Sequence, residues 1–278
     1  MTQYYKKHLY HYKQPRDWKI ESIRRKISKD PFSYIDLDIK YKNEVFITYN
    51  ALIREESLFS SMPIHFQEDI EFLKNVLSQN EKIFFEIDIK KRTSKVLVEV
   101  FIEKISKKNT EVEDSIYFEK ALGEKYFTNP ENILYLANLL ERYCSKFVLE
   151  KFTPKVFSLI SDSFKNDSEF VGKLVQRCPT MFSLIKPYFQ DEPDFLVEVM
   201  KKTQGQVFPH FHEEFRSDPF FVYKMNEINP VNEYYLKGKA KNLVSTGINI
   251  DKFKNLVDYD KLINTLSNNN KPHKKLKV

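Results

Sequence analysis

One arrangement of phenylalanines recurs along this chain and constrains its fold more than any other feature. A phenylalanine is followed by a second one seven residues later and by a third six residues after that. The two clearest copies are Phe182, Phe189 and Phe195 within residues 182–200, and Phe208, Phe215 and Phe221 within residues 208–225. Self-similarity at a period of about 20–50 residues predicts an array of stacked repeats.

Seven segments align on the first apolar residue of an expected helix. These anchor residues are Val45, Phe72, Val96, Ile133, Phe170, Phe195 and Phe221. The residues one and four positions after each anchor are apolar in all seven segments. Such spacing forms one wide stripe on a helix, whereas a strand needs a period of two. The anchors lie 27, 24, 37, 37, 25 and 26 residues apart, so we expect insertions around residues 109–118 and 143–152.

A second aromatic series precedes the helices and is expected to lie in the core. It comprises Phe32, Phe59, Phe84, Phe157, Phe182, Phe208 and Tyr234. A shorter helix or turn is predicted there, while Asn129, Asp167, Asp218 and the pair Thr93-Ser94 supply N-caps for the longer helices. Because one such helix pair cannot bury its own stripe, neighbouring pairs must stack. The prediction is an all-α fold, a curved or superhelical α-solenoid of about seven helix-turn-helix repeats of roughly 25 residues.

Charge divides the chain into basic ends and an acidic middle. Residues 1–29 carry nine Lys/Arg and two Asp/Glu (net +7), residues 237–278 carry ten and three (net +7), and residues 30–236 carry 26 and 34 (net −8). We predict a basic arm and capping helix over 1–29, the repeat array over 30–236, a helical cap over 237–266 and a disordered basic tail over 267–278. The capping helix is expected over residues 16–28, with Trp18, Ile20, Ile23 and Ile27 on its apolar face.

The layout of the repeats resembles the uncharacterised helical repeats called domain of unknown function 4116. The resemblance is carried by residues 182–196 and 59–73, in which an apolar residue and small residues lead into an acidic segment and an apolar helix. This chain has Phe and Tyr where that family favours Ala and Leu, and it lacks the family's frequent glycine. The resemblance implies an all-helical repeat fold over residues 30–236 and assigns no activity and no functional residues.

The densest group of potential metal ligands is His210, His212, Glu213 and Glu214. On one helix His210 and Glu214 would share a face, but the sequence offers no third ligand and the group falls in a short helix of the repeat pattern. A solvated polar face is therefore expected here. The five glycines of the chain are too far apart to form a phosphate-binding loop. We predict no enzyme, no metal and no cofactor.

Two cysteines, Cys144 and Cys178, lie in apolar helical patterns and are expected to be buried thiols. Two cysteines cannot form a disulfide framework, which favours a reducing compartment. The chain is rich in Lys, Asn, Ile, Phe and Tyr, as is typical of AT-rich bacterial, phage or viral genomes. We expect a cytoplasmic location, or the host cytoplasm for a viral or secreted effector, and no membrane span.

Fold class and charge favour non-enzymatic recognition of another macromolecule, namely a protein, by an inhibitor, regulator or scaffold. One alternative is a nucleic-acid-binding protein that uses its basic ends, where tyrosines and cations alternate in residues 4–13. A second alternative is an enzyme with an unrecognised site. The candidate residues for an anionic partner are Lys6, Lys7, Lys13, Arg24, Arg25, Lys26, Lys274 and Lys275. Contact residues are expected among positions that do not repeat, because the repeating rings are needed for stacking.

Overall fold

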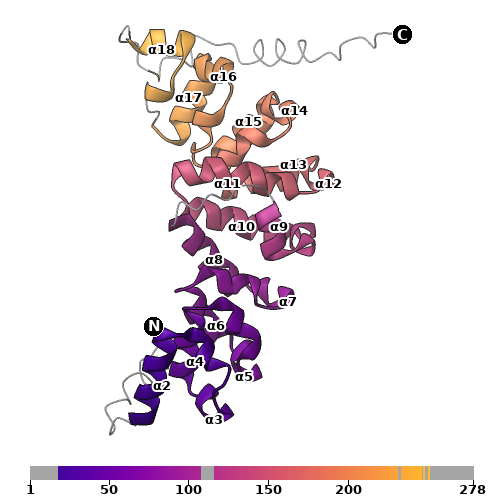
Figure 1. Ribbon diagram of the computed structural model, residues 1–278. Coiled ribbons are helices and arrows are strands. Elements are labelled where there is room, and N and C mark those ends of the chain that lie inside the picture. The colour runs from indigo at the N-terminus through magenta and orange to yellow at the C-terminus, as the bar shows by residue number, and fades with distance from the viewer. Residues whose placement is uncertain (1–17, 108–115, 231–232, 246, 248–249, 251–278) are drawn as a thin grey trace, which may run out of the picture. The chain divides into compact units, whose positions relative to one another are not determined.

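The computed structural model describes residues 18–107, 116–230, 233–245, 247 and 250, and these residues contain helices and connecting turns (Figure 1). None of them lies in a β-strand, which confirms the predicted all-α class. The chain separates into two compact units. The first comprises residues 1–126 and 142–148, and the second comprises residues 127–141 and 149–278.

The first unit begins with α2 (Trp18–Lys29), and its 3-10 helices are labelled η. The elements that follow are η2 (Pro31–Tyr34), α3 (Ile39–Lys42), α4 (Val45–Leu52), η3 (Glu56–Ser61), α5 (Ile64–Glu68), α6 (Ile70–Leu77), η4 (Glu81–Phe85), α7 (Ile89–Arg92), α8 (Lys95–Lys107) and α9 (Ile116–Leu122). The element η5 (Glu124–Thr128) leads from this unit into the second.

The second unit contains most of α10 (Pro130–Tyr143) and of α11 (Lys146–Leu159). The elements that follow are α12 (Asp162–Lys165), α13 (Ser168–Arg177), η6 (Pro179–Leu184), α14 (Pro187–Gln190), α15 (Pro193–Lys202), η7 (Phe208–His210), α16 (Glu213–Ser217), α17 (Pro219–Ile228), η8 (Glu233–Tyr235) and α18 (Gly238–Ser245). The insertion predicted around residues 143–152 is part of helix α11. The one predicted around 109–118 lies largely outside the described residues.

Each clear repeat contains three helical elements rather than the predicted pair. A 3-10 helix is followed by a short helix of four or five residues and then by a longer helix, as in η3, α5 and α6. Helix α11 takes the place of the 3-10 helix before α12 and α13. Longer helices of successive repeats pack against each other, α6 on α8 in the first unit and α13 on α15 and α15 on α17 in the second.

Burial shows that the predicted register is wrong in the first and third repeats. Phe32 is 51% exposed, whereas Tyr34 two residues later is fully buried. Val96 is likewise exposed and Leu97 is fully buried. With these shifts, and with the buried Ile47 as anchor in place of the partly exposed Val45, the ring lies 13 residues before the anchor in six repeats, whereas the anchor Ile133 has Lys120 at that distance. The pairs are Tyr34 and Ile47, Phe59 and Phe72, Phe84 and Leu97, Phe157 and Phe170, Phe182 and Phe195, and Phe208 and Phe221. Adjacent apolar residues fit the sequence pattern in either register, so only packing distinguishes them.

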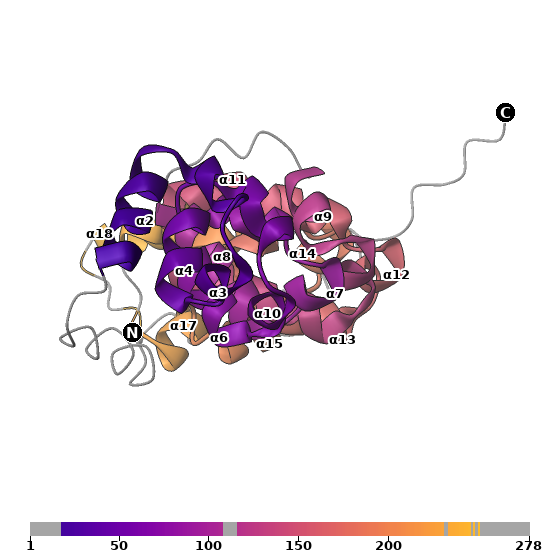
Figure 2. The same ribbon diagram turned by 60° about the horizontal axis from the view of Figure 1, so that its bottom comes forward.

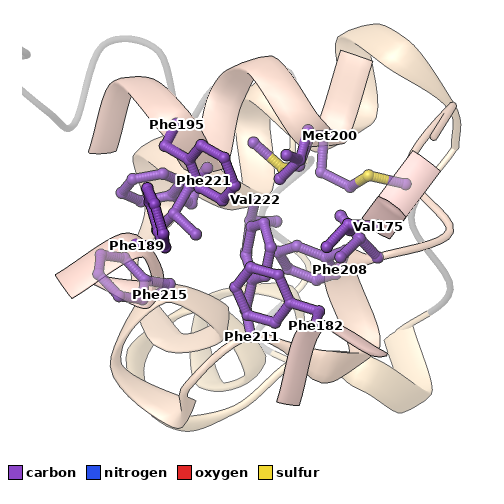
Figure 3. Packing of buried hydrophobic residues seen from close by; sticks show 14 of the residues in the cluster. Val175, Phe182, Phe189, Phe195, Met200, Phe208, Phe211, Phe215, Phe221 and Val222 are labelled. Atoms are coloured by element: carbon purple, nitrogen blue, oxygen red, sulfur yellow. The ribbon is translucent and has the colours of Figure 1, made fainter. Parts of the chain in front are cut away.

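A second ring, seven residues after the first, packs against the anchor ring in four repeats. The ring centroids are 4.6 Å apart for Phe66 and Phe72, 4.9 Å for Phe164 and Phe170, 5.1 Å for Phe189 and Phe195, and 4.9 Å for Phe215 and Phe221. The rings of the last two of these pairs, Phe189 with Phe195 and Phe215 with Phe221, join one buried cluster in the second unit, which Figure 3 shows from close by. The prediction that the recurrent phenylalanines are core residues is confirmed there.

The same prediction fails at three positions near the ends of the described chain. Phe32 is half exposed, and Tyr234 on η8 is 82% exposed. Trp18 was expected on the apolar face of the first helix but is 77% exposed. The physical reason for Trp18 is its angular position. Ile20, Ile23 and Ile27 follow the i, i+3, i+7 spacing of one face, and a residue two positions before Ile20 points to the other side.

Most predicted helix caps are confirmed. The side chain of Asp167 accepts hydrogen bonds from the backbone N–H groups of Glu169 and Phe170, and Asp218 does the same at the start of α17. Asn129 Oδ1 accepts from the backbone N–H of Glu131. Thr93 differs from the prediction, because its hydroxyl donates to the carbonyl of Lys90 at the end of α7. These bonds fix where the longer helices begin.

Candidate functional site

The short helices of the first unit carry a row of exposed isoleucines. Ile39, Ile64 and Ile89 are the first residues of α3, α5 and α7, and they are 61%, 66% and 45% exposed. Each lies five residues after the buried ring of its repeat, so successive members are 25 residues apart. We call these three residues the isoleucine row. Single exposed apolar side chains are common on proteins, but a repeated one at the same structural position needs an explanation.

Local capping positions the row. The carboxylates of Asp38 and Asp88 accept from the backbone N–H groups of Lys40 and Lys90, so α3 and α7 start at the isoleucine. Pro63 occupies the corresponding place before α5. These bonds involve only backbone and capping groups, and they would form with any residue at the isoleucine position. The capping therefore does not explain why the residue is isoleucine.

A long hydrogen-bond donor lies eight residues after each ring and braces the short helix. Lys42 donates to Ile35 O at 2.7 Å, Gln67 to Met62 O at 3.0 Å, Arg92 to Ile87 O at 2.7 Å, Lys165 to Ser158 O at 3.4 Å and Gln190 to Ile185 O at 2.8 Å. Arg216 holds the same position in the repeat of Phe208, but its buried Nε has no hydrogen-bond partner in the structure. These donors satisfy carbonyls at or near the end of the preceding helix.

Some donors also connect one short helix to the next repeat. Lys91 of α7 donates to Gln67 O at 3.3 Å and pairs with Glu68, both at the end of α5. Arg92 donates to the carbonyls of Lys120 and Ala121 at 2.9 and 3.2 Å, at the end of α9. Burial lowers the pKa of Arg92, with Asp88 and Glu86 acting against that shift. Arg92 is therefore a structural cation that donates to three backbone carbonyls, those of Ile87, Lys120 and Ala121.

The row also contacts the following segment. A Cβ atom built on Gly123 would lie 2.7 Å from Ile89 Cδ1, so only glycine fits beside that side chain without displacing it. Gly123 also has a φ of +78°, in the left-handed region that favours glycine. Helix α7 is thus joined to α5 by Lys91, and to α9 and the segment after it by Arg92 and by one close apolar contact.

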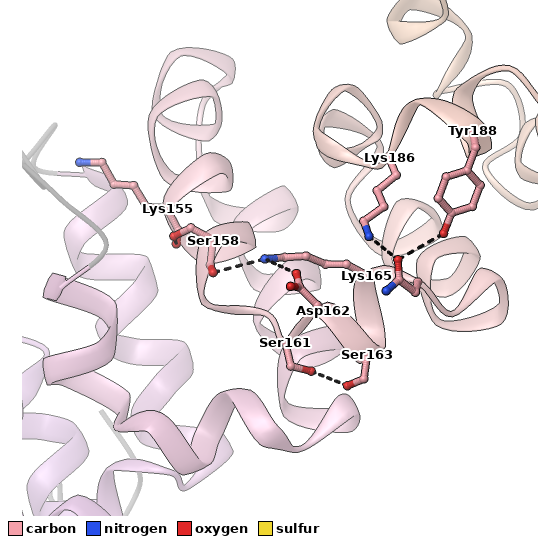
Figure 4. Close-up of polar contacts among 9 residues, drawn as sticks. Lys155, Ser158, Ser161, Asp162, Ser163, Lys165, Lys186 and Tyr188 are labelled. Atoms are coloured by element: carbon pink, nitrogen blue, oxygen red, sulfur yellow. Dashed lines mark hydrogen bonds and ion pairs between the residues drawn. The ribbon is translucent and has the colours of Figure 1, made fainter. Parts of the chain in front are cut away.

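In the second unit the same short-helix positions are polar or proline. Asp162, Pro187 and Glu213 begin α12, α14 and α16. Figure 4 shows the polar contacts around the first two of these helices. Both Lys186 and Tyr188 donate to Asn166 Oδ1, the tyrosine at 3.5 Å. Lys165 lies 3.9 Å from Asp162 and stands over the ring of Phe157.

The candidate residues for an anionic partner are only partly described. Lys6, Lys7, Lys13, Lys274 and Lys275 lie outside the described residues. Arg24, Arg25 and Lys26 are all on α2, but they do not form one patch. The guanidinium of Arg24 lies 5.0 Å from the centre of the Phe46 ring, toward the helix α4 on which α2 packs, while Arg25 is 76% exposed. Glu21 lies 3.5 Å from each of these two arginines.

The histidine cluster does not have the predicted helical geometry. His210 ends η7 and Glu214 belongs to α16, so the two residues are not on one helix. His212 Nε2 lies 2.6 Å from Gln190 Oε1. Since the Gln190 amide donates to the carbonyls of Phe182 and Ile185, its oxygen must accept, and Nε2 of His212 must carry a proton. Among the described residues, no three His, Cys, Asp or Glu side chains could hold a metal ion.

Both cysteines are buried thiols, as predicted, and neither forms a disulfide. Cys178 also has a polar partner, because its thiol and the Glu141 carboxyl share a hydrogen bond. Burial is the main cause that raises the pKa of both groups, and the negative charge of Glu141 raises the pKa of Cys178 further. A thiol that stays protonated is a poor nucleophile and a poor metal ligand. Cys178 is therefore an unreactive core residue.

No protein family matches this chain, and no match was found among curated proteins or solved structures. The resemblance to the domain of unknown function 4116 repeats stays a prediction. Within the part of the chain that the structure describes, no helix is both long and apolar enough to cross a membrane.

Proposed function

We propose that this chain is a non-enzymatic helical-repeat protein that binds another protein along the short helices of its first unit. The isoleucine row carries the proposal. Its three side chains recur at one position of the repeat, remain largely exposed and are not required by the capping that surrounds them. Burying exposed apolar surface is the main driving force of protein association.

The proposal includes a stacked array of repeats of roughly 25 residues as the supporting scaffold. Two observations support stacking within the units. Longer helices of successive repeats pack together, and short helices are joined to the next repeat by Lys91 and Arg92 in the first unit and by Gln190 and His212 in the second. Such braced edges hold contact residues in fixed positions, which lowers the entropic cost of binding.

The partner protein would be inhibited, regulated or scaffolded by this contact. Two buried cysteines without a disulfide are compatible with the reducing cytoplasm, which we propose as the location. The uncharacterised helical repeats that this chain resembles have no assigned activity. The resemblance is therefore consistent with a scaffold that acts in recognition.

The test compares two triple variants of the full chain in affinity capture from the native source, followed by cross-linking. The first variant carries Ile39→Ser, Ile64→Ser and Ile89→Ser. The control carries serine at three exposed aromatic positions elsewhere, Phe147, Tyr188 and Tyr234. We expect the first variant to lose a protein that the wild type and the control both retain.

Cross-links place the contact. In the wild type they should join the captured protein to Lys40 and Lys90, the exposed lysines next to the row. Equal capture by both variants, or cross-links confined to other parts of the chain, would overturn the proposal.

A further inference from the structure

The outer face of α2 presents an open aromatic ring beside exposed cations, of which Arg25 lies 3.5 Å from Glu21. Trp18, Ser22, Arg25 and Lys29 follow one another at i, i+4, i+7 and i+11, so they lie along one stripe of the helix, with Lys26 adjacent. All five are exposed, and Trp18 is the only tryptophan in the chain. Tryptophan is highly buried on average, so one that is 77% exposed at the start of a basic helix is unusual.

Folding accounts for the other face of α2 but not for this one. Ile27 is fully buried, and α2 packs on α4 and η2. Arg24 and Lys19 lie over the rings of Phe46 and Tyr41, at 5.0 and 5.9 Å from the ring centres. These contacts hold the helix in place, and the side chains of Trp18, Lys26 and Lys29 make no hydrogen bond or ion pair with another described residue.

We propose that the outer face of α2 binds single-stranded nucleic acid, with one base stacked on Trp18 and phosphates contacted by Arg25, Lys26 and Lys29. Helix α2 has five cations and one carboxylate, Glu21, so its charge complements a polyanion. The stripe is about 16 Å long at 1.5 Å per residue, enough for several phosphates of one strand. Aromatic stacking with a cationic track is how proteins bind single strands without sequence readout.

The surroundings of Trp18 argue against a protein partner and against a membrane surface. A tryptophan that anchors a protein interface sits in a dry, well-packed centre, whereas the stripe beyond Trp18 is serine, arginine and lysine. A helix that lies in a membrane surface needs an apolar face directed outward, whereas Ile27 of α2 is buried. Base stacking needs only an accessible ring, and bases within a duplex are not available for it.

This proposal is independent of the isoleucine row. The isoleucine row begins on α3, whose Tyr41 ring lies under Lys19 of α2, and ends on α7, which lies to the right of α2 within the first unit in both views (Figures 1 and 2). Variants of one surface leave the other intact, so either proposal can fail while the other stands.

Because Trp18 is the sole tryptophan, its fluorescence reports on this face alone. The full chain is titrated with a 12-nucleotide oligothymidylate at low salt. Saturable quenching of Trp18 is expected, together with binding that weakens as salt rises. Trp18→Ala, measured by the anisotropy of the labelled oligonucleotide, should weaken binding roughly 5- to 150-fold, the range seen when one stacking ring is removed.

The cations are tested by the pair Lys26→Gln and Lys29→Gln. Each lost phosphate contact should reduce the slope of log affinity against log salt by ~0.7. The matched control is Lys201→Gln with Lys241→Gln, two exposed lysines of the second unit whose removal changes net charge equally and should leave affinity and slope unchanged. Unchanged Trp18 fluorescence, equal effects of both pairs, or equally tight binding of duplex DNA or polyglutamate would each overturn the proposal.

Discussion

The two units have similar residues at their buried ring and anchor positions and differ in the exposed residue that begins each short helix. Five residues after the buried ring, the first unit has Ile39, Ile64 and Ile89, all exposed, while the second has Asp162, Pro187 and Glu213. At the ring and anchor positions both units have large apolar or aromatic side chains. Because the ring and anchor positions are buried, they require apolar side chains. The exposed first position of the short helix has no such requirement. The isoleucines of the first unit are therefore better explained by binding than by folding.

The largest expected effect tests whether the two cores are equivalent. Phe72→Ala in the first unit and Phe221→Ala in the second, both at fully buried anchors, should each reduce the free energy of unfolding by about 3–5 kcal/mol. Urea denaturation measures the loss, and hydrogen exchange shows which unit opens.

Phe32→Ala is the matched control for the register of the first repeat. Because this ring is half exposed, we expect a change within about 0.5 kcal/mol. A loss as large as that of Phe72→Ala would restore the register predicted from sequence and contradict the burial of Tyr34.

The donor eight residues after the ring should matter more in the second unit than in the first. Gln190 is buried and serves Phe182, Ile185 and His212, so Gln190→Leu leaves three polar groups without their partner. We expect a loss of about 1–3 kcal/mol in thermal or urea unfolding.

Gln67→Leu is the corresponding change in the first unit. Gln67 is only partly buried and donates to one carbonyl, that of Met62. Its removal should have less than half the effect of Gln190→Leu. Equal losses of unfolding free energy in the two variants would show that the stabilisation by this donor does not depend on the number of hydrogen bonds it makes.

Alkaline pH should separate the units. Burial raises the pKa of Tyr34 and Tyr117, both in the first unit, from 10.0 to about 12. A folded-state pKa above the unfolded value means that their contribution is fully present below about pH 10 and is lost as the pH rises through about 12. The corresponding first rings of the second unit are Phe157, Phe182 and Phe208, which do not titrate.

Burial also raises the pKa of the Cys178 thiol in the second unit, so the comparison uses a Cys178→Ala background, in which hydrogen exchange between pH 9 and 11 should show the first unit opening first. Tyr34→Phe should reduce this pH dependence, at a cost at neutral pH of about 1 kcal/mol for the lost bond from its hydroxyl to Thr48. Opening that begins in the second unit, or that is unchanged in Tyr34→Phe, would contradict this assignment.

The smallest stability effect is expected where the units differ most. The triple change Ile39→Ser, Ile64→Ser and Ile89→Ser should alter the unfolding midpoint only slightly, because these side chains are largely exposed. Thermal unfolding measured beside the capture experiment gives the comparison. A large loss of stability would mean that the isoleucine row is needed for folding. The exposure of these residues would then no longer support a role in binding.

Part of the proposed binding surface could have been found from the sequence. Ile39, Ile64 and Ile89 are spaced by 25 residues, the period of the repeat, and a search for residues repeating outside the aromatic series would have located them. We instead expected contact residues among positions that do not repeat. That expectation assumed that repeating residues are buried. Periodicity shows only that residues occupy equivalent positions in successive repeats, and such positions can be buried or exposed.

The sequence by itself determined the helical class, the repeating rings and most of the caps, because these depend on interactions within one repeat. Apolar residues spaced for a helix form a stripe wherever they occur, and an Asp before a helix caps it locally. Tertiary structure decided which of two neighbouring apolar residues is buried, as with Val96 and Leu97, and which positions stay open, as with the isoleucine row. Those outcomes depend on neighbouring repeats, whose positions no single segment of the sequence contains.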